Sequence, residues 1–313
     1  MTLDWNTLAP GSVTDTLLRP DVGAEVEIAC RVVRGARPGP SLLVTAGVHG
    51  AEYASIEAAV RLLNTDAQTL SGTLVVLPIV NPPAYRARSI YINPLDGKNL
   101  NRCFPGDPAG SYAERLAHWL TTTFIAQADA YLDLHGGDLV EALEPFCIVP
   151  AGDPASLALG RAFGLPHLTV SESGVMSLAA ARARGVPAVI AEAGGQGQWP
   201  EEAVTLLVDG VQRVMRHLGL LDTAPAAPPV QEYTALAWLS APTGGLWYPT
   251  VTIGQQVAAG EALGSIRDVF GRPLASIASP ASGTVLFAVT SLAMNAGDPL
   301  YGIGTPSLEA PYV

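Results

Sequence analysis

Between about Ala24 and Leu218, short apolar segments alternate with segments of helical periodicity. Apolar runs of this length, bounded by turn residues, are typical of buried strands. Their alternation with helices is typical of an α/β domain built on a mostly buried sheet. The predicted strands are residues 26–33, 41–46, 73–80, 130–134, 146–149 and 188–192. The predicted helices are residues 52–63, 111–125, 155–163, 177–183 and 201–218.

Two other stretches break this alternation. Residues 81–110 show no clear period and contain five prolines, and a loop of that length is often functional. Residues 222–230, DTAPAAPPV, have the composition of a linker. Beyond them, short strand-like runs separated by turns, with no helix-length pattern after Trp238, indicate a small all-β module. We therefore expect an α/β domain over residues 1–221, a Pro/Ala linker over 222–230 and an all-β domain over 231–313.

Charge and composition exclude several classes of protein. The 17 basic and 28 acidic residues give a net charge of −11, the wrong sign for a protein that neutralises phosphates. The mean hydropathy is +0.29, yet no apolar run reaches the roughly 20 residues of a membrane-spanning helix. No signal-peptide pattern opens the chain, and the three cysteines lack CxxC spacing. We expect a soluble cytoplasmic protein that binds neither nucleic acid nor membrane.

A first candidate site lies in the segment Thr45-Ala46-Gly47-Val48-His49-Gly50-Ala51-Glu52. A predicted strand ends in a glycine-flanked turn that holds His49, and a helix begins near Glu52. Open α/β sheets bind ligands at the carboxyl ends of their strands, so both side chains can share one metal ion there. The alternative is a turn histidine followed by a glutamate that the helix dipole favours.

A second histidine has the same setting. His135 ends an apolar strand and is followed by two glycines, which allow the backbone or a ligand to approach closely. Together, His49, Glu52 and His135 make a His2Glu set, the three-ligand arrangement of catalytic zinc hydrolases. The three remaining histidines, at positions 118, 167 and 217, lack such flanks, and we assign them to packing or to the surface.

Three motifs in this order resemble the succinylglutamate desuccinylase/aspartoacylase family, which is related to the zinc carboxypeptidases. They are GVHGAE at residues 47–52, DGKNLNRCFPG at residues 96–106 and DLHGG at residues 133–137. The resemblance covers roughly residues 41–208 and continues into the β module. It implies a mixed sheet flanked by helices and one Zn²⁺ held by His49, Glu52 and His135. It also implies that Asn101 and Arg102 hold the substrate carboxylate or shape its pocket.

The side-chain chemistry of Asn101 and Arg102 favours the same assignment. The guanidinium of Arg102 is a planar fork suited to bidentate carboxylate binding, and Asn101 adds amide donors beside it. The alternative is an Asn-Arg pair that only stabilises its loop.

A zinc hydrolase also needs a general base and a group that stabilises the oxyanion. Glu192 ends an apolar strand, and the family places its catalytic glutamate in a similar Glu-x-Gly context, so we predict Glu192 as the base. The alternative is a surface acid that ends the strand. For the oxyanion the family uses an arginine in this part of the chain, but this sequence departs from relatives near residues 91–93. We favour Arg88 over Arg86, and either can be a solvated loop charge.

The C-terminal module resembles the barrel-sandwich domain of lipoyl and biotinyl carriers. Carriers attach their cofactor to a lysine at a hairpin tip, here expected near residues 269–271. The only lysine of the chain is Lys98, so no group can be attached in the module. A structural, substrate-restricting or oligomerising role is left, and the sequence does not choose among these.

The leading hypothesis is a zinc-dependent amidohydrolase that deacylates a small N-acyl amino acid or N-acyl diamino acid. Its partner is that small molecule, and assembly into a homo-oligomer is left open. The alternatives are a metallocarboxypeptidase that trims peptides and a non-catalytic binding protein of the same fold.

Overall fold

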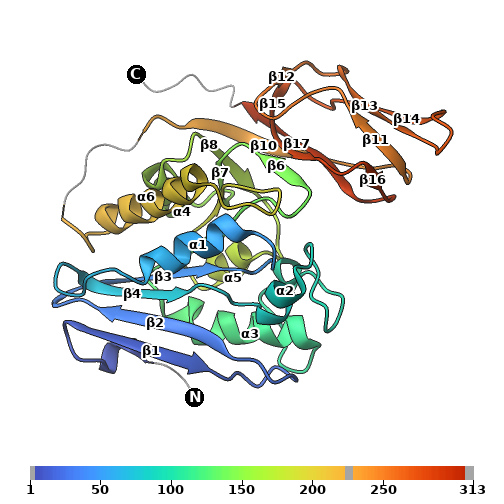
Figure 1. The fold of residues 1–313 in the computed structure, drawn as a ribbon. Helices are drawn as coiled ribbons and strands as arrows, with labels where there is room; N and C mark the ends of the chain where they lie inside the picture. Colours follow the sequence, from blue (N-terminus) through green and yellow to red (C-terminus); the bar gives the residue numbers. More distant parts are fainter. Residues whose placement is uncertain (1–3, 223–227, 307–313) are drawn as a thin grey trace.

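A single large β-sheet runs through the computed structural model, which describes residues 4–222 and 228–306 (Figure 1). Its strand order is β1-β2-β4-β3-β5-β9-β7-β8-β10-β17-β15-β12, and β6 pairs with β15 beside this path. The strands before residue 222 are β1 (Ser12–Leu18), β2 (Ile28–Arg34), β3 (Arg37–Ala46), β4 (Ser71–Leu77), β5 (Ala130–His135), β6 (Glu141–Leu143), β7 (Phe146–Pro150), β8 (His167–Ser171) and β9 (Ala188–Glu192).

The sheet is mixed. Strands β4, β3, β5 and β9 are parallel. At one edge β1 and β2 are antiparallel to their neighbours, and β7 is antiparallel to β9 but parallel to β8. The carboxyl ends of β3, β5 and β9 therefore lie together along one side of the sheet. The predicted α/β class with a mixed sheet flanked by helices is confirmed.

Helices cover both faces of this sheet. One face packs against α1 (Tyr53–Leu62), α4 (Pro154–Phe163) and α6 (Glu201–His217), and the other against α3 (Tyr112–Thr123) and α5 (Ser177–Ala183). Because successive strand residues point to opposite faces, neighbours such as Leu42 and Leu43 belong to the two different cores. All five helices match the predicted ranges to within two residues at each end.

Some elements were not predicted. Strand β1 is half exposed, β6 has only three residues, and only two of the five residues of β8 are fully buried, so none shows a clear apolar pattern. The short helix α2 (Pro82–Ala87) lies in the long stretch predicted as a loop. Its first two residues are prolines, which tolerate the first turn of a helix because the amides there have no intrahelical partner.

The chain after residue 228 is all-β within the described residues, as predicted. Its strands are β10 (Gln231–Ser240), β11 (Gly245–Pro249), β12 (Gln256–Val257), β13 (Ala262–Arg267), β14 (Pro273–Ala278), β15 (Gly283–Val289), β16 (Ala293–Met294) and β17 (Pro299–Pro306). Four of them form a second sheet, in the order β14-β13-β11-β16, and a separate core fills the module. The hairpin predicted near residues 269–271 connects β13 and β14, and its tip exposes Val269 and Phe270.

The two parts of the chain share the large sheet. Strand β10 pairs in parallel with β8, and β6 pairs with β15. The predicted linker lies mostly outside the described residues, which omit 223–227, and the predicted domain limits stay predictions. Within the described ranges, no helix combines the length and apolarity needed to cross a bilayer.

Candidate functional site

The ends of β3 and β5 bring His49, Glu52 and His135 together. Glycines allow the turn after β3: Gly47 has a φ of +68°, and a Cβ at Gly50 would lie 2.1 Å from the backbone of Ala84 in α2. Glu52 then caps the N-terminus of α1 without a side-chain bond to the helix, so its carboxylate is free to turn toward the histidines.

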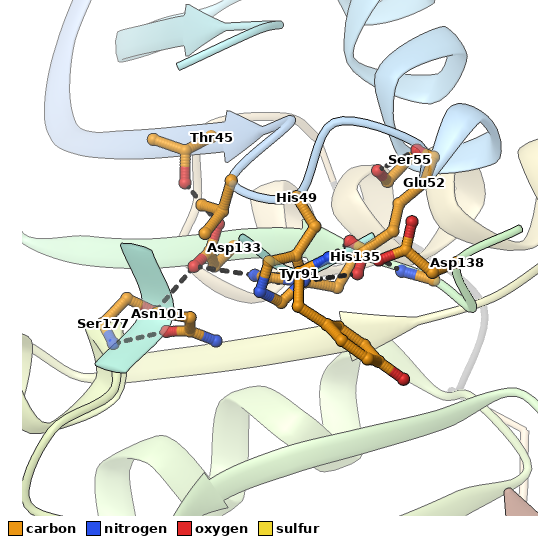
Figure 2. A network of polar contacts seen from close by, with 12 residues as sticks. Thr45, His49, Glu52, Ser55, Tyr91, Asn101, Asp133, His135, Asp138 and Ser177 are labelled. Atoms are coloured by element: carbon orange, nitrogen blue, oxygen red, sulfur yellow. Dashed lines mark hydrogen bonds and ion pairs between the residues drawn. The ribbon is translucent and has the colours of Figure 1, made fainter. Parts of the chain in front are cut away.

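The three side chains face one another in the interior (Figure 2). Glu52 Oε1 lies 2.6 Å from His49 Nδ1, and Glu52 Oε2 lies 2.9 Å from His135 Nδ1. One ligand atom from each residue lies within 4.8 Å of the other two, and all three residues are at most 8% exposed. This is a set of donors that can hold one metal ion.

The outer nitrogens of both rings show why a cation fits between these donors. His49 Nε2 lies 3.1 Å from Asn99 Oδ1, which also accepts a hydrogen bond from the Asn101 amide, and His135 Nε2 lies 3.2 Å from Asp133 Oδ2. The Asn99 acceptor favours the His49 tautomer that leaves a lone pair on Nδ1, and the negative charge of Asp133 near His135 Nε2 favours the same tautomer of His135, although the two atoms are not aligned as a hydrogen bond. Two lone pairs then point at a carboxylate at hydrogen-bond distance, which requires a proton or a metal ion between them.

The closeness of Glu52 to the two histidines also changes their pKa values. Burial opposes the charged form of both histidines, but the Glu52 carboxylate outweighs it and raises the pKa of His49 and of His135. Without a metal, protons therefore occupy the positions that a metal would take.

Asp133 lies behind His135 and is fully buried. It accepts hydrogen bonds from Thr45 Oγ1 and Ser177 Oγ, each at 2.6 Å (Figure 2). Burial raises the pKa of Asp133, but His135 and the two hydroxyl donors together keep it below its usual value. A carboxylate held in this way orients the imidazole that it faces.

A cavity of about 760 Å³ opens onto these donors. His49, Glu52, Asn101, Arg102 and Glu192 all line it, so five of the seven predicted site residues share this space. A sixth, His135, contacts Glu52 directly.

Asn101 and Arg102 are held in the short 3₁₀ turn η2 (Leu100–Arg102). Asn101 is 4% exposed, and its Oδ1 accepts the Ser177 amide at 3.0 Å, which leaves its Nδ2 donor for a ligand. The Arg102 guanidinium donates at 3.2 Å to the Asn101 carbonyl and otherwise opens to the cavity. The pair can therefore bind an anionic group.

Glu192 is the last residue of β9 and pairs in register with His135 on β5. Burial raises the pKa of Glu192 to about 8. A carboxyl group with a pKa near neutrality, beside a possible metal position, is suited to exchange protons with a reacting group.

Arg88 and Arg86 are not brought to the cavity. Arg88 ends α2 in a left-handed conformation with a φ of 52°, and both side chains are exposed and absent from the cavity lining. The oxyanion role of Arg88 stays a prediction, and Arg102 is the sole arginine among the described lining residues.

Sequence reasoning gave no role to Asp133 or Asn99, which lie beside the outer nitrogens of the two histidines. A signal for Asp133 was present, because residues two apart on a strand share a face, and Asp133 precedes His135 by two. Asn99 sits two residues before Asn101 in the DGKNLNR motif, but its contact with His49 depends on the tertiary fold.

Comparisons with known proteins identify the family of the chain. The sequence model of the succinylglutamate desuccinylase/aspartoacylase catalytic domain matches residues 38–218. The chain belongs to this family. It is 30% identical over 245 residues to the N-alpha-acetyl-L-2,4-diaminobutyric acid deacetylase of Halomonas elongata, an alignment covering 74% of this chain and 71% of that protein. As a member of this family, the chain is an amide-hydrolysing enzyme.

Solved structures of family members show the same fold over nearly the whole chain. The succinylglutamate desuccinylase/aspartoacylase from Rhodobacter sphaeroides has a TM-score of 0.85 at 29% identity and covers 97% of this chain and 98% of its own. The product-bound ectoine utilization protein EutE (DoeB) from Ruegeria pomeroyi has a TM-score of 0.83 at 25% identity, covering 96% and 98%.

In this family member, the C-terminal module contributes part of the cavity lining. Leu236, Trp238 and Phe287, which we call the module wall, line the same cavity as the histidine site. The rings of Trp238 and Phe287 lie 5.0 Å apart. A Cβ at Gly302 would lie within 3.2 to 3.5 Å of all three side chains, so the glycine gives them room to gather.

Proposed function

We propose that this enzyme hydrolyses the amide bond of a small N-acyl amino acid or N-acyl diamino acid with the help of one zinc ion. The observation that carries the proposal is the pair of Nδ1 atoms aimed at the two oxygens of Glu52. Two imidazoles and one carboxylate form a donor set that suits zinc. When bound, zinc acts as a Lewis acid on the amide carbonyl and makes water more acidic.

The residues of the chain have separate tasks in this proposal. Arg102 and Asn101 bind the carboxylate of the amino acid and so place its amide near the histidine site. Glu192 accepts a proton from the attacking water and returns it to the nitrogen of the leaving amine. Asp133 and Asn99 keep both imidazoles in one orientation and one tautomer.

The module wall supports a small substrate rather than a peptide. Leu236, Trp238 and Phe287 line the same cavity as Arg102, so a substrate held there shares its space with bulky side chains. Carboxypeptidase action would need room for a peptide chain beyond the scissile bond. The named activities of two relatives, the diaminobutyrate deacetylase and a succinylglutamate desuccinylase of Burkholderia cenocepacia that is 35% identical over 134 residues, also support deacylation.

A hydrolysis screen with parallel metal analysis tests the proposal. We expect one zinc per chain and amine release from N-acetyl, N-succinyl or N-acyl diamino substrates, with no trimming of unmodified peptides. Release of C-terminal residues from peptides would instead favour the carboxypeptidase alternative, and a metal-free, inactive protein would favour the binding protein. A cytoplasmic location and homo-oligomer formation are proposals that this screen leaves to separate measurements.

A further inference from the structure

Glu141 is a buried acid that lines the same cavity and has no role in the hydrolysis proposed above. It lies in β6, lines the cavity and is 2% exposed. Its Oε2 accepts the Asp138 amide at 2.7 Å, but its Oε1 has no hydrogen-bond donor among the described residues. Leaving a buried carboxylate oxygen without a partner is costly, so the position calls for a donor from a ligand.

The backbone fixes Glu141 in this position. Strand β6 pairs with β15 of the C-terminal module, with Glu141 opposite Val289. The Glu141 carbonyl accepts the Gln196 amide at 2.9 Å, and a Cβ at Gly195 would lie 2.3 Å from that carbonyl oxygen. Because the segment is held on both sides, the backbone of Glu141 is fixed beside the cavity that its side chain lines.

The charges around Glu141 indicate the kind of donor. Burial raises the pKa of Glu141 to about 8, although the hydrogen bond from the Asp138 amide acts in the opposite direction. A counter-ion would stabilise the charged carboxylate. Arg102 is the only arginine or lysine among the described residues lining the cavity, and it does not bond to Glu141. The cavity thus offers a cationic position for a carboxylate and a separate acidic position without a cation.

We propose that Glu141 binds the side-chain ammonium of the substrate, which makes the substrate an N-acyl diamino acid. This inference rests on the proposed function, because it assumes that an N-acyl amino acid occupies the cavity. The substrate carboxylate then lies at Arg102, its amide at the histidine site and its ammonium at Glu141 Oε1. A second carboxylate in place of the ammonium would meet Glu141 as a like charge, so N-acyl aspartate and N-acyl glutamate are disfavoured.

Substrate selectivity tests this inference in the unmodified, zinc-loaded enzyme. Nα-acetyl-2,4-diaminobutyrate is compared with Nα-acetylnorvaline, which has a methyl group where the ammonium stands, and with N-acetylaspartate. We expect kcat/KM to be at least about tenfold higher for the diamino compound, since hydrogen bonds to charged groups are the strong ones. Equal values for the diamino compound and norvaline would overturn the proposal without any variant.

Glu141→Gln then assigns the selectivity to one residue. The variant keeps the shape and removes the charge, so we expect KM for the diamino compound to rise by about tenfold or more while the values for Nα-acetylnorvaline stay within about twofold. The matched control is Glu144→Gln, which removes a half-buried charge three residues away that does not line the cavity. An equal loss on both substrates would show a purely structural role and overturn the proposal.

Binding of the deacylated product separates this inference from the proposed function. Calorimetry measures binding of 2,4-diaminobutyrate and of norvaline to the unmodified enzyme and to Glu141→Gln. If no N-acyl compound is hydrolysed, the proposed function fails, yet tighter binding of the diamino acid that Glu141→Gln abolishes still supports the ammonium site. Binding that does not distinguish the two ligands, or that Glu141→Gln leaves unchanged, overturns it.

Discussion

The strand-end side of the cavity carries His49, Glu52 and Glu192, whereas the module wall carries Leu236, Trp238 and Phe287. On the first side the two candidate histidine ligands each lie against a further polar side chain, Asp133 beside His135 and Asn99 beside His49. On the second side the contacts are apolar and the largest residue, Trp238, is 53% exposed. In the proposed function, the residues at the strand ends therefore carry out the chemistry, and those of the module limit the shape of the substrate.

Removing the proposed base gives the largest expected effect. Glu192→Gln keeps the size of the side chain and loses its proton acceptor, so we expect kcat to fall by about 10²–10⁴-fold with metal content unchanged. Steady-state kinetics and elemental analysis on the same preparation measure both quantities. Full activity in this variant would remove Glu192 from the chemistry.

The second largest effect is expected from removing the Asp133 carboxylate that faces His135. Asp133→Asn removes the negative charge that faces Nε2, and we expect zinc affinity to fall by about 10–100-fold. Competition with a chelator measures this without relying on turnover. Ser177→Ala, which removes one of the two hydroxyls on Asp133, should have a smaller effect. Unchanged affinity in Asp133→Asn would show that the carboxylate does not orient the ring.

Substrate anchoring is expected to affect KM more than kcat. Arg102→Lys keeps the charge but loses the planar fork, so KM should rise by about tenfold. Arg115→Lys is the matched control, because Arg115 bonds to the Gly110 carbonyl outside the cavity. Equal effects in both variants would show that the loss comes from loop stability rather than from substrate binding.

The module wall should affect selectivity rather than rate. With Trp238→Ala we expect kcat/KM for the best small substrate to change by about twofold, because the side chain is half exposed. Longer acyl chains should become substrates as space opens. Trp199→Ala is the control, since this exposed tryptophan does not line the cavity. If Trp238→Ala abolished turnover of every substrate, the division between the two sides would be wrong.

The stability of the metal-free protein should fall as the pH rises, and bound zinc should weaken this dependence. The pKa of Glu141 and of Glu192 is raised to about 8 by burial, so both carboxyl groups hold more protons in the folded than in the unfolded state between about pH 4.5 and 8. The raised pKa of His49 and His135 acts in the same direction above pH 6.5. The Tm of the metal-free protein should therefore fall by a few degrees from pH 6 to 8.5.

Zinc should reverse part of that fall, because fewer protons compete for the imidazoles at higher pH. Thermal unfolding at both pH values, with and without zinc, measures the effect. A metal-free protein that becomes more stable over this pH range would contradict the assigned pKa directions.

The two sides also differ in how far the sequence predicts them. Strand ends next to glycine, as at His49 and His135, are local patterns, so the candidate metal ligands and the α/β class can be predicted from short stretches of sequence. Glu141 and the module wall depend on pairings between distant segments, such as β6 with β15. No local pattern encodes which side chains those pairings bring to the cavity. The exposed position of Arg88 has the same origin, since the end of α2 sets its direction.

Titration of zinc into the metal-free enzyme tests the central claim that three facing donors form the catalytic metal site. Deacylation of the best N-acyl substrate should rise linearly and stop at one zinc per chain, and His135→Ala should show no such rise. Full activity before zinc is added, or an undiminished rise in His135→Ala, would contradict the claim.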